Sequence, residues 1–222
     1  APAANCILLP DGVSMESGAM AEPAAVAAHA VRRSSIKAGD AVAVFGAGPI
    51  GLLVAQWARI HGALSVWLVD IDDRKFETAE MLGFTDFCNP RMSDTVEVIR
   101  SATGRGVDVA IEATGASAAL EQLVQCVCPF GSVSLLGNPA GTMSLSQNAY
   151  WHVLRNELHL NGCWNSVFAE LPRNEWELAL KCMASGLLQT TPLISHRCSL
   201  ETLPQHLQSM HENAFPFSKV ML

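Results

Sequence analysis

The chain has 222 residues, of which 50% are hydrophobic and 16% are charged, and its formal net charge is −7. This composition predicts a folded globular protein and excludes a disordered one, and the acidic balance argues against a nucleic-acid partner, because a phosphate backbone requires a basic surface. No run of about 18 apolar residues occurs, so we expect no membrane-spanning helix. The first residues have no basic stretch and no initiator methionine. We therefore expect no signal peptide and a chain that begins partway through a longer protein.

Seven cysteines are spread along the chain without a CxxC pair: Cys6, Cys88, Cys126, Cys128, Cys163, Cys182 and Cys198. Their odd number and irregular spacing are typical of reduced thiols rather than of a disulfide framework, and they predict a cytoplasmic protein. Structural zinc requires four clustered ligands, and no partner pair lies near Cys126 and Cys128 in the sequence. We therefore interpret these two cysteines as packing residues.

The predicted elements begin with an alanine-rich helix at 24–33, after which apolar runs of strand length alternate with helical patterns. The strands are expected at 41–45, 65–70, 86–88, 107–112, 132–136 and 158–164, and the helices between them at 50–60, 74–82, 94–101, 116–128 and 149–155. Several of these strands are continuously apolar, which is typical of a parallel sheet that is buried on both faces. The alternating order predicts an α/β fold, namely a doubly wound, parallel, six-stranded sheet of the Rossmann type.

The two flanks break this alternation and divide the chain into residues 1–40, 41–165 and 166–222. The second flank is expected to contain a helix at 174–185, a strand at 193–197, a helix at 203–212 and a strand at 218–222. Each flank is too short to form a domain by itself. We therefore expect the flanks to belong together, or to sequence outside this chain.

The segment Gly46-Ala47-Gly48-Pro49-Ile50-Gly51 lies between the first predicted strand and the helix that follows it. A GxGxxG motif is weak evidence by itself, but this is the context that a dinucleotide site requires. Gly46 would permit the tight turn, Gly48 would let the backbone approach the pyrophosphate, and Gly51 would let the helix pack closely on the strand. The free N–H groups at the start of the helix would then face the phosphates.

The second predicted strand ends at Asp70, which is where an acid is expected to meet the adenosine ribose. A carboxylate can accept hydrogen bonds from both ribose hydroxyls, and it would repel the 2′-phosphate of NADP. Asp70 therefore predicts NAD as the cofactor. Arg74 and Lys75 weigh against this preference, because either cation could pair with a phosphate, and we include Lys75 among the cofactor-binding residues.

Three further strand ends supply backbone near the expected nicotinamide and adenine positions, because ligands of open α/β sheets lie at the carboxyl ends of the strands. The residues at these ends are Thr114 and Gly115 after the fourth strand, Leu136, Gly137 and Asn138 after the fifth, and Cys163, Trp164 and Asn165 after the sixth. Each segment is unspecific by itself, and together they complete the predicted dinucleotide site.

Taken in order, these segments resemble the zinc-dependent medium-chain alcohol dehydrogenases, and especially the branch of the sorbitol and galactitol-1-phosphate 5-dehydrogenases. The resemblance is carried by AEP at 21–23, HA at 29–30, VFGAGPIGL at 44–52, EATG at 112–115, LRNEL at 154–158, GCW at 162–164, EWE at 175–177, PLISHR at 192–197 and KVML at 219–222. It covers nearly the whole chain, and the order of the segments is more specific than any single motif.

The resemblance implies that a GroES-like barrel precedes the cofactor domain and that the chain returns to this barrel at its end. Residues 1–40 would then be the end of the catalytic domain with a linking helix, and residues 166–222 would be the return. The barrel has no counterpart here, so the catalytic residues stay unassigned, and this chain alone is expected to be inactive. Glu22 matches a glutamate that in the polyol branch ligates zinc directly or through water, in the full-length protein. Alternatively, Glu22 is an ordinary first-turn helix carboxylate.

The resemblance implies NAD- and zinc-dependent oxidation of a secondary alcohol, in a polyol or polyol phosphate, to a ketone. It also implies a homodimer or homotetramer. One alternative is a zinc-free, NADPH-dependent enzyme similar to the quinone reductases, against which Asp70 and the Glu22-Pro23 pair argue. Another is a stand-alone NAD-binding module, against which the long tail after residue 165 argues. His29, on the helix that follows Glu22, is interpreted as structural.

Overall fold

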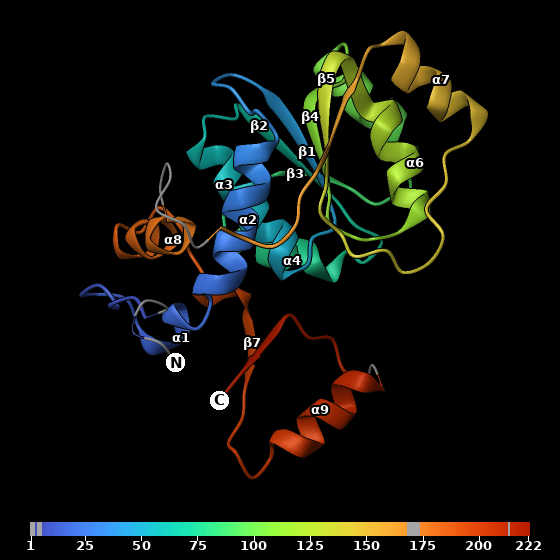
Figure 1. The fold of residues 1–222 in the computed structure, drawn as a ribbon. Helices are drawn as coiled ribbons and strands as arrows, with labels where there is room; N and C mark the ends of the chain where they lie inside the picture. Colours follow the sequence, from blue (N-terminus) through green and yellow to red (C-terminus); the bar gives the residue numbers. More distant parts are fainter. Residues whose placement is uncertain (1–2, 4–5, 168–173, 213) are drawn as a thin grey trace.

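The computed structural model describes residues 3, 6–167, 174–212 and 214–222, and its centre is a parallel sheet of six strands (Figure 1). The strands are β1 (Ala41–Phe45), β2 (Ser65–Val69), β3 (Asp86–Cys88), β4 (Val107–Glu112), β5 (Val127–Leu135) and β6 (His159–Gly162). They lie in the order β3-β2-β1-β4-β5-β6, so the chain winds from the centre to one edge and then to the other. The predicted doubly wound Rossmann sheet is confirmed.

Strand β1 shows why this sequence forms a central parallel strand. Val42 and Val44 pack into one hydrophobic layer, whereas Ala43 and Phe45 pack into the layer on the opposite face. Successive side chains of a strand point to opposite faces, so a continuous apolar run is buried only between two layers. The neighbours β2 and β4 both pair with β1 in parallel, and this register aligns the carboxyl ends of the three strands.

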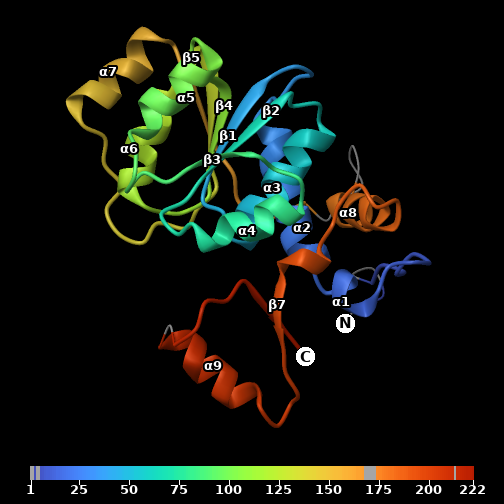
Figure 2. The same cartoon turned by 180° about the vertical axis from the view of Figure 1, so that it is seen from behind.

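Helices cover both faces of the sheet (Figures 1 and 2). One layer contains α2 (Ala21–Arg33), α3 (Pro49–Ile60) and α4 (Arg74–Met81), with α8 (Glu175–Ala184) packed against α2. The other layer contains α5 (Thr95–Thr103), α6 (Ser117–Cys126) and α7 (Gln147–Arg155). Among the described residues, no helix has the length and the apolar character that crossing a membrane requires.

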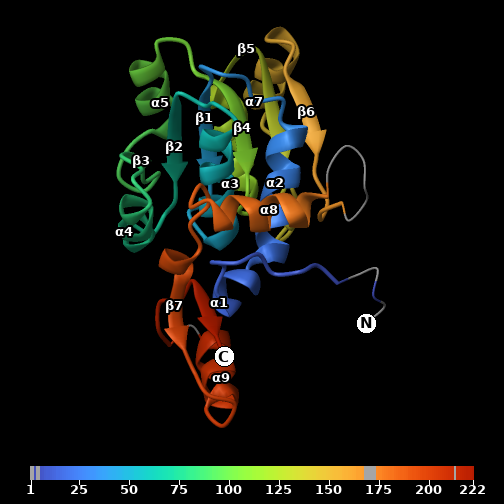
Figure 3. The same ribbon diagram turned by 90° about the vertical axis from the view of Figure 1, so that its left-hand side faces the viewer.

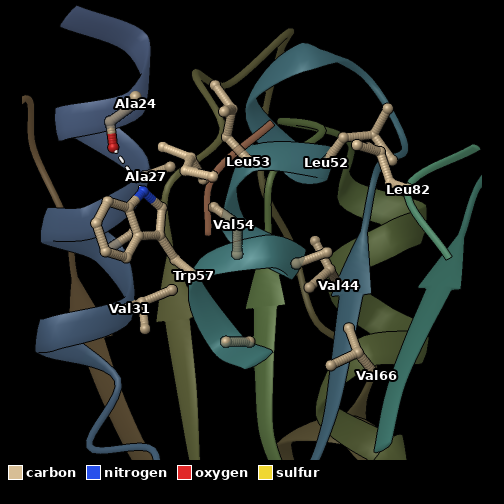
Figure 4. Close-up of a cluster of buried hydrophobic side chains, with 14 of the residues drawn as sticks. Ala24, Ala27, Val31, Val44, Leu52, Leu53, Val54, Trp57, Val66 and Leu82 are labelled. Atoms are coloured by element: carbon tan, nitrogen blue, oxygen red, sulfur yellow. Dashed lines mark hydrogen bonds between the residues drawn. The ribbon is translucent and has the colours of Figure 1, made fainter. Parts of the chain in front are cut away.

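The largest fully buried side chain, Trp57, joins helices α2 and α3 (Figure 4). Its indole Nε1 donates a hydrogen bond to the backbone oxygen of Ala24 over 2.9 Å, and Val31 of α2 belongs to the same cluster of buried side chains. A buried indole needs such a partner for its N–H group. Helix α2, which lies in the predicted N-terminal flank, is therefore part of the core of the Rossmann layer.

The structure differs from the sequence-based expectation at the junction of α6 and β5. A helix was expected to reach residue 128 and a strand to begin at 132, whereas α6 ends at Cys126 and β5 begins at Val127. Val127 pairs with Val107 of β4, and the register then shifts so that Ser132 pairs with Val109. This long-range pairing starts the strand early, and the irregular part between the two pairs turns Phe130 outward.

The end of the chain forms a small lobe that extends away from the sheet (Figures 1 and 3). It consists of β7 (Ile194–Arg197), α9 (Leu203–His211) and β8 (Lys219–Met221), and the two strands pair in parallel. The lobe is joined to the short helix α1 (Met15–Gly18) by Arg197, whose guanidinium donates two hydrogen bonds to the Glu16 carboxylate over 2.5 and 2.8 Å. These bonds bring together the two predicted flanks, which are far apart in the sequence.

Candidate functional site

The turn between β1 and α3 has the geometry that its glycines predict. Gly46 has a φ of +105°, which a residue with a side chain rarely adopts. A Cβ atom on Gly51 would lie 1.8 Å from the backbone oxygen of Gly46, so only glycine fits at this crossing of helix and strand. By contrast, a Cβ atom on Gly48 would meet nothing within 4 Å. Gly48 therefore borders open space at the start of α3, whose first residue is Pro49.

Asp70 follows β2 directly, is only 7% exposed, and is held against the glycine turn. Its Oδ2 accepts a hydrogen bond from the backbone N–H of Ala47 over 2.8 Å, and its Oδ1 accepts one from the N–H of Asp72 over 3.0 Å. The ammonium group of Lys75 contacts both carboxylate oxygens, over 3.0 and 2.9 Å. Three donors therefore hold the Asp70 carboxylate in a fixed position.

The two cations near Asp70 are used differently. Arg74 binds Asp72 through Nε and Nη2, each over 2.8 Å, and this pair holds the pKa of the Asp72 carboxyl below its usual value. Lys75 instead lies on Asp70. Arg74 is therefore engaged by a neighbouring acid, and the cation that reaches the predicted ribose position is Lys75.

The turn after β4 depends on Glu112, a residue to which the sequence analysis assigned no role in the site. Its carboxylate is almost fully buried and accepts hydrogen bonds from the backbone N–H groups of Thr114 and Gly115, over 2.7 and 2.9 Å, and from the Thr114 hydroxyl. Its backbone oxygen accepts bonds from the N–H groups of Leu136 and Gly137, each over 2.9 Å. Glu112 thus ties the ends of β4 and β5 together. The available sequence signal was an acid directly after the apolar run Val109-Ala110-Ile111.

The turns at the carboxyl ends of β1, β4 and β5 pack on one another without room for further side chains. A Cβ atom on Gly46 would lie 3.0 Å from Cγ2 of Thr114, and one on Gly115 would lie 1.7 Å from the backbone oxygen of Asn138. A Cβ atom on Gly137 would lie 2.3 Å from the backbone nitrogen of Gly115. The predicted residues of these three turns therefore form one continuous surface.

A cleft of about 410 Å³ opens beside these turns and brings together eight of the residues that the sequence singled out. They are Glu22, Ile50, Leu136, Gly137, Asn138, Cys163, Trp164 and Asn165, and they are joined by Val26 and Ala113. The cleft lies at the carboxyl ends of the strands, and Glu22, in the first turn of α2, reaches it as well. The other predicted residues lie in the adjoining turns and next to β2.

The wall that follows β6 has two unusual features. Asn165 has a φ of +60°, a conformation that asparagine tolerates better than most residues. Trp164 is 78% exposed, although it lines the cleft. Cys163 is buried beside it, and this burial raises the pKa of its thiol. The thiol is therefore neutral at physiological pH and contributes an apolar surface to the cleft.

The described residues do not fit a catalytic zinc ion by themselves. Nowhere in the described ranges do three or more His, Cys, Asp or Glu side chains form a group that could hold a metal ion. Zinc in proteins is held by at least three such ligands, so Glu22 alone is insufficient. His29, on the same helix, contacts Oε1 of Glu175 over 3.0 Å, and Arg32 donates to the same oxygen over 3.0 Å. These contacts join α2 to α8, as a structural role for His29 requires.

Comparison with known proteins places this arrangement among dehydrogenases. The model of the family described as zinc-binding dehydrogenase matches residues 49–185. Sorbitol dehydrogenase of Bacillus subtilis is 31% identical over 216 residues, which are 97% of this chain and 58% of that protein. Galactitol 1-phosphate 5-dehydrogenase of Escherichia coli is 30% identical over 224 residues, 98% of this chain and 63% of that protein. The chain thus spans about three-fifths of the length of these relatives.

Solved structures show the same likeness. The crystal structure of galactitol-1-phosphate dehydrogenase from Escherichia coli superimposes with a TM-score of 0.89 at 30% identity, covering 98% of this chain and 63% of that one. The structure of 2R,3R-butanediol dehydrogenase from Bacillus subtilis gives a TM-score of 0.83 at 31% identity, covering 96% of this chain and 58% of that one.

Proposed function

Because the chain belongs to the zinc-binding dehydrogenase family, we propose that it binds NAD and forms the cofactor-binding part of an alcohol dehydrogenase. The full-length enzyme would oxidise a secondary alcohol of a polyol or polyol phosphate to a ketone. The observation that carries the proposal is the cleft at the carboxyl ends of the strands, which gathers eight predicted residues beside the glycine turn. The names of the relatives, sorbitol dehydrogenase and galactitol 1-phosphate 5-dehydrogenase, support the substrate class.

The residues present fit a dinucleotide. The open space at Gly48 and the start of α3 would receive the pyrophosphate, because the unpaired N–H groups and the dipole of a helix start favour anions. Asp70 and Lys75 would hold the adenosine ribose. Ile50, Leu136 and Cys163 would provide an apolar wall for the nicotinamide, and NAD, when bound, supplies the acceptor for the hydride.

We assign no step to zinc in this chain, because the described residues do not form a site for it. Glu22 would contribute one ligand only in a longer protein whose other segments supply the remaining ligands. Zinc would then act there as a Lewis acid on the alcohol oxygen. Zinc dependence is therefore a proposal about the full-length enzyme, as is its catalytic activity.

A second candidate cofactor is NADP, and a specific observation favours it. The crystal structure of a zinc-binding dehydrogenase from Sinorhizobium meliloti, 29% identical to this chain with a TM-score of 0.83, is described as bound to NADP. The buried carboxylate of Asp70 argues for NAD, because it would lie close to a 2′-phosphate and repel it. We retain NAD as the proposal.

The assembly and the compartment are also proposals. Strand β6 is one of the two edge strands of the sheet and most of its residues are exposed, so two copies could pair along it across a two-fold axis to give a dimer or tetramer. Six cysteines of the described ranges, namely Cys88, Cys126, Cys128, Cys163, Cys182 and Cys198, are free thiols, which supports a reducing compartment such as the cytoplasm.

The proposal is tested by titrating the chain with NADH and, separately, with NADPH, while energy transfer from tryptophan to the reduced nicotinamide is followed. Trp164 lines the cleft and provides a nearby donor. We expect saturable binding of NADH and much weaker binding of NADPH. Tighter binding of NADPH would overturn the role of Asp70. If a chain that unfolds cooperatively, and is therefore folded, binds neither nucleotide, the proposed cofactor site would be overturned.

A further inference from the structure

A second cleft, of about 500 Å³, lies at the opposite end of the sheet from the cofactor cleft, and the two have no lining residue in common. It is formed at the amino ends of β4, β5 and β6, together with the segment that follows α2. In Figure 3, this is the end of the sheet that faces away from the C-terminal lobe. The dinucleotide site does not use any part of it.

Two residues with a positive φ lie beside this second cleft. Four non-glycine residues of the described chain have a positive φ, and two of them, Ser35 at +61° and Phe130 at +63°, line it. Such a conformation costs about 1–3 kcal/mol for a residue with a side chain, and it persists only where the surroundings enforce it. The N–H group of Phe130 donates to the backbone oxygen of Asn156 over 2.7 Å, so the loop after α7 holds it in place.

The unfavourable backbone conformation of Phe130 does not bury its side chain in the hydrophobic core. The side chain is 68% exposed, so folding leaves a large aromatic ring in water while its backbone adopts an unfavourable conformation. The positive φ is the disfavoured feature, and the exposed ring belongs to the lining of the cleft. They are explained if the ring is held ready to stack against a flat group in the cleft.

Two cations, Lys37 and Arg105, and two carboxylates, Asp40 and Asp108, line the cleft. Asp108 is occupied, because its Oδ1 accepts a hydrogen bond from Nη2 of Arg105 over 2.5 Å and its Oδ2 accepts one from the N–H of Ala41 over 2.9 Å. Asp40 accepts a bond from the backbone N–H of Lys37 over 2.7 Å. Within the described ranges, the ammonium group of Lys37 forms no ion pair, and Arg105 uses only one of its nitrogens.

Strand β6 adds polar groups to the same wall. Asn161 donates from Nδ2 to the hydroxyl of Ser132 over 3.0 Å, and its own carbonyl oxygen remains available. The imidazole of His159 also lines the cleft. The contact with Ser132 places the Asn161 side chain toward the neighbouring strand β5.

We propose that this cleft is a second binding site, for a small anion that carries a flat ring, such as an aromatic phosphate or carboxylate. The ring would stack on Phe130. The anion would be bound by the ammonium group of Lys37 and by the unused donors of Arg105. This site is independent of the cofactor cleft and of the proposed dehydrogenase activity, because it uses none of the same residues.

The test uses phenyl phosphate as the probe and isothermal titration calorimetry on the whole chain, with NADH present at saturation to block the cofactor cleft. Two variants separate the two contacts. Phe130→Gly removes the ring and suits the positive φ, so the chain should fold at least as stably as the wild type. Lys37→Gln removes the free ammonium group. Lys181→Gln, at an exposed lysine on α8, is the matched control.

We expect saturable binding of phenyl phosphate by the wild type and by Lys181→Gln, and binding weakened at least about fivefold in each of the other two variants. Inorganic phosphate should compete weakly, because it lacks the ring. Three results would overturn the proposal: no saturable binding, unchanged affinity in Phe130→Gly or in Lys37→Gln, or binding of the probe that occurs only when NADH is left out. Conversion of an oligomer to a monomer by Phe130→Gly would also overturn it, because the cleft would then be an interface between copies.

Discussion

The ammonium group of Lys75 lies within 3.0 Å of both carboxylate oxygens of Asp70, and the same carboxylate accepts the N–H of Ala47 from the glycine turn. The residue at the predicted ribose position is thus connected to the predicted pyrophosphate position through a single hydrogen bond. Because Lys75 is half-exposed and Asp70 is buried, the lysine is the partner that can shift when a ribose arrives. The proposed cofactor selectivity and the position of the glycine turn therefore depend on the same carboxylate.

Replacing Asp70 by Asn should change the preference between the cofactors. The carboxylate charge, which would repel a 2′-phosphate, is lost, while the shape of the side chain is kept. We expect the ratio of the NADPH to the NADH dissociation constant to fall by about tenfold, equivalent to about 1.4 kcal/mol. The exposed Asp73, replaced by Asn, provides the matched control for the change in net charge. A ratio that changes equally in both variants would show that Asp70 has no specific role.

The fold and part of the site could be predicted because their signals are local. A glycine turn between an apolar strand and a helix, or an acid at the end of the next strand, can be identified from a few consecutive residues. The role of Gln56 could not be identified in this way. Gln56 exchanges two hydrogen bonds with the backbone of Gln189, over 3.0 and 2.8 Å, across 133 positions of sequence. No local sequence pattern predicts a hydrogen-bond partner that is 133 positions away.

The predicted position of the junction between α6 and β5 was wrong for the same reason, because it depends on pairing with a residue far away in the sequence. Residues 126–128 are apolar and continue a helical pattern, so periodicity alone extends the helix. Pairing with Val107 makes Val127 a strand residue, and the following residues bulge before regular pairing resumes at Ser132. Tertiary pairing overrides local preference in such segments. The exposed Phe130 of the second cleft results from this bulge and was therefore also missed.

Two alanine substitutions in the glycine turn should separate folding from binding. In Gly51→Ala the added methyl would lie 1.8 Å from the Gly46 oxygen, so we expect a loss of stability of about 3 kcal/mol or more. In Gly48→Ala the methyl meets nothing within 4 Å, and the free energy of unfolding should change by about 1 kcal/mol or less. Urea unfolding of both variants measures these effects.

The effect of Gly48→Ala on NADH affinity should be much larger than its effect on the free energy of unfolding. The methyl of Gly48→Ala would occupy the open space through which a pyrophosphate approaches, so NADH affinity should fall by at least about tenfold in a variant that folds normally. Normal NADH affinity in Gly48→Ala would contradict the placement of the pyrophosphate at this turn.

Replacing Trp57 by Phe should weaken the attachment of α2 to the Rossmann core. The variant loses the hydrogen bond to the Ala24 oxygen and part of a fully buried ring, and we expect a loss of about 2 kcal/mol in the free energy of unfolding. Trp151, a half-exposed tryptophan that lies near Arg155, provides the control, because its replacement by Phe should change stability by about 0.5 kcal/mol or less. Equal losses in both variants would contradict a special role for the α2–α3 contact.

Stability at alkaline pH should depend on Cys126. Burial raises the pKa of this thiol from 9.0 to about 12, so between these values the unfolded chain loses the proton while the folded chain keeps it. The folded state then binds more protons than the unfolded state, and the free energy of unfolding falls as pH rises, by about 1.4 kcal/mol per pH unit for this group. Below about pH 9 both states hold the proton, and the effect vanishes.

Comparison with Cys126→Ala isolates this effect, because every other titrating group is common to both proteins. At pH 7 the variant should be less stable by roughly 1 kcal/mol, since a small buried group is lost. Between pH 9 and 10.5 the advantage of the wild type should shrink and then reverse, as measured by urea unfolding at each pH. Parallel curves for the two proteins across this range would show that the Cys126 thiol ionises equally in the folded and unfolded chains, and that its burial in the layer of α5 and α6 does not control its proton.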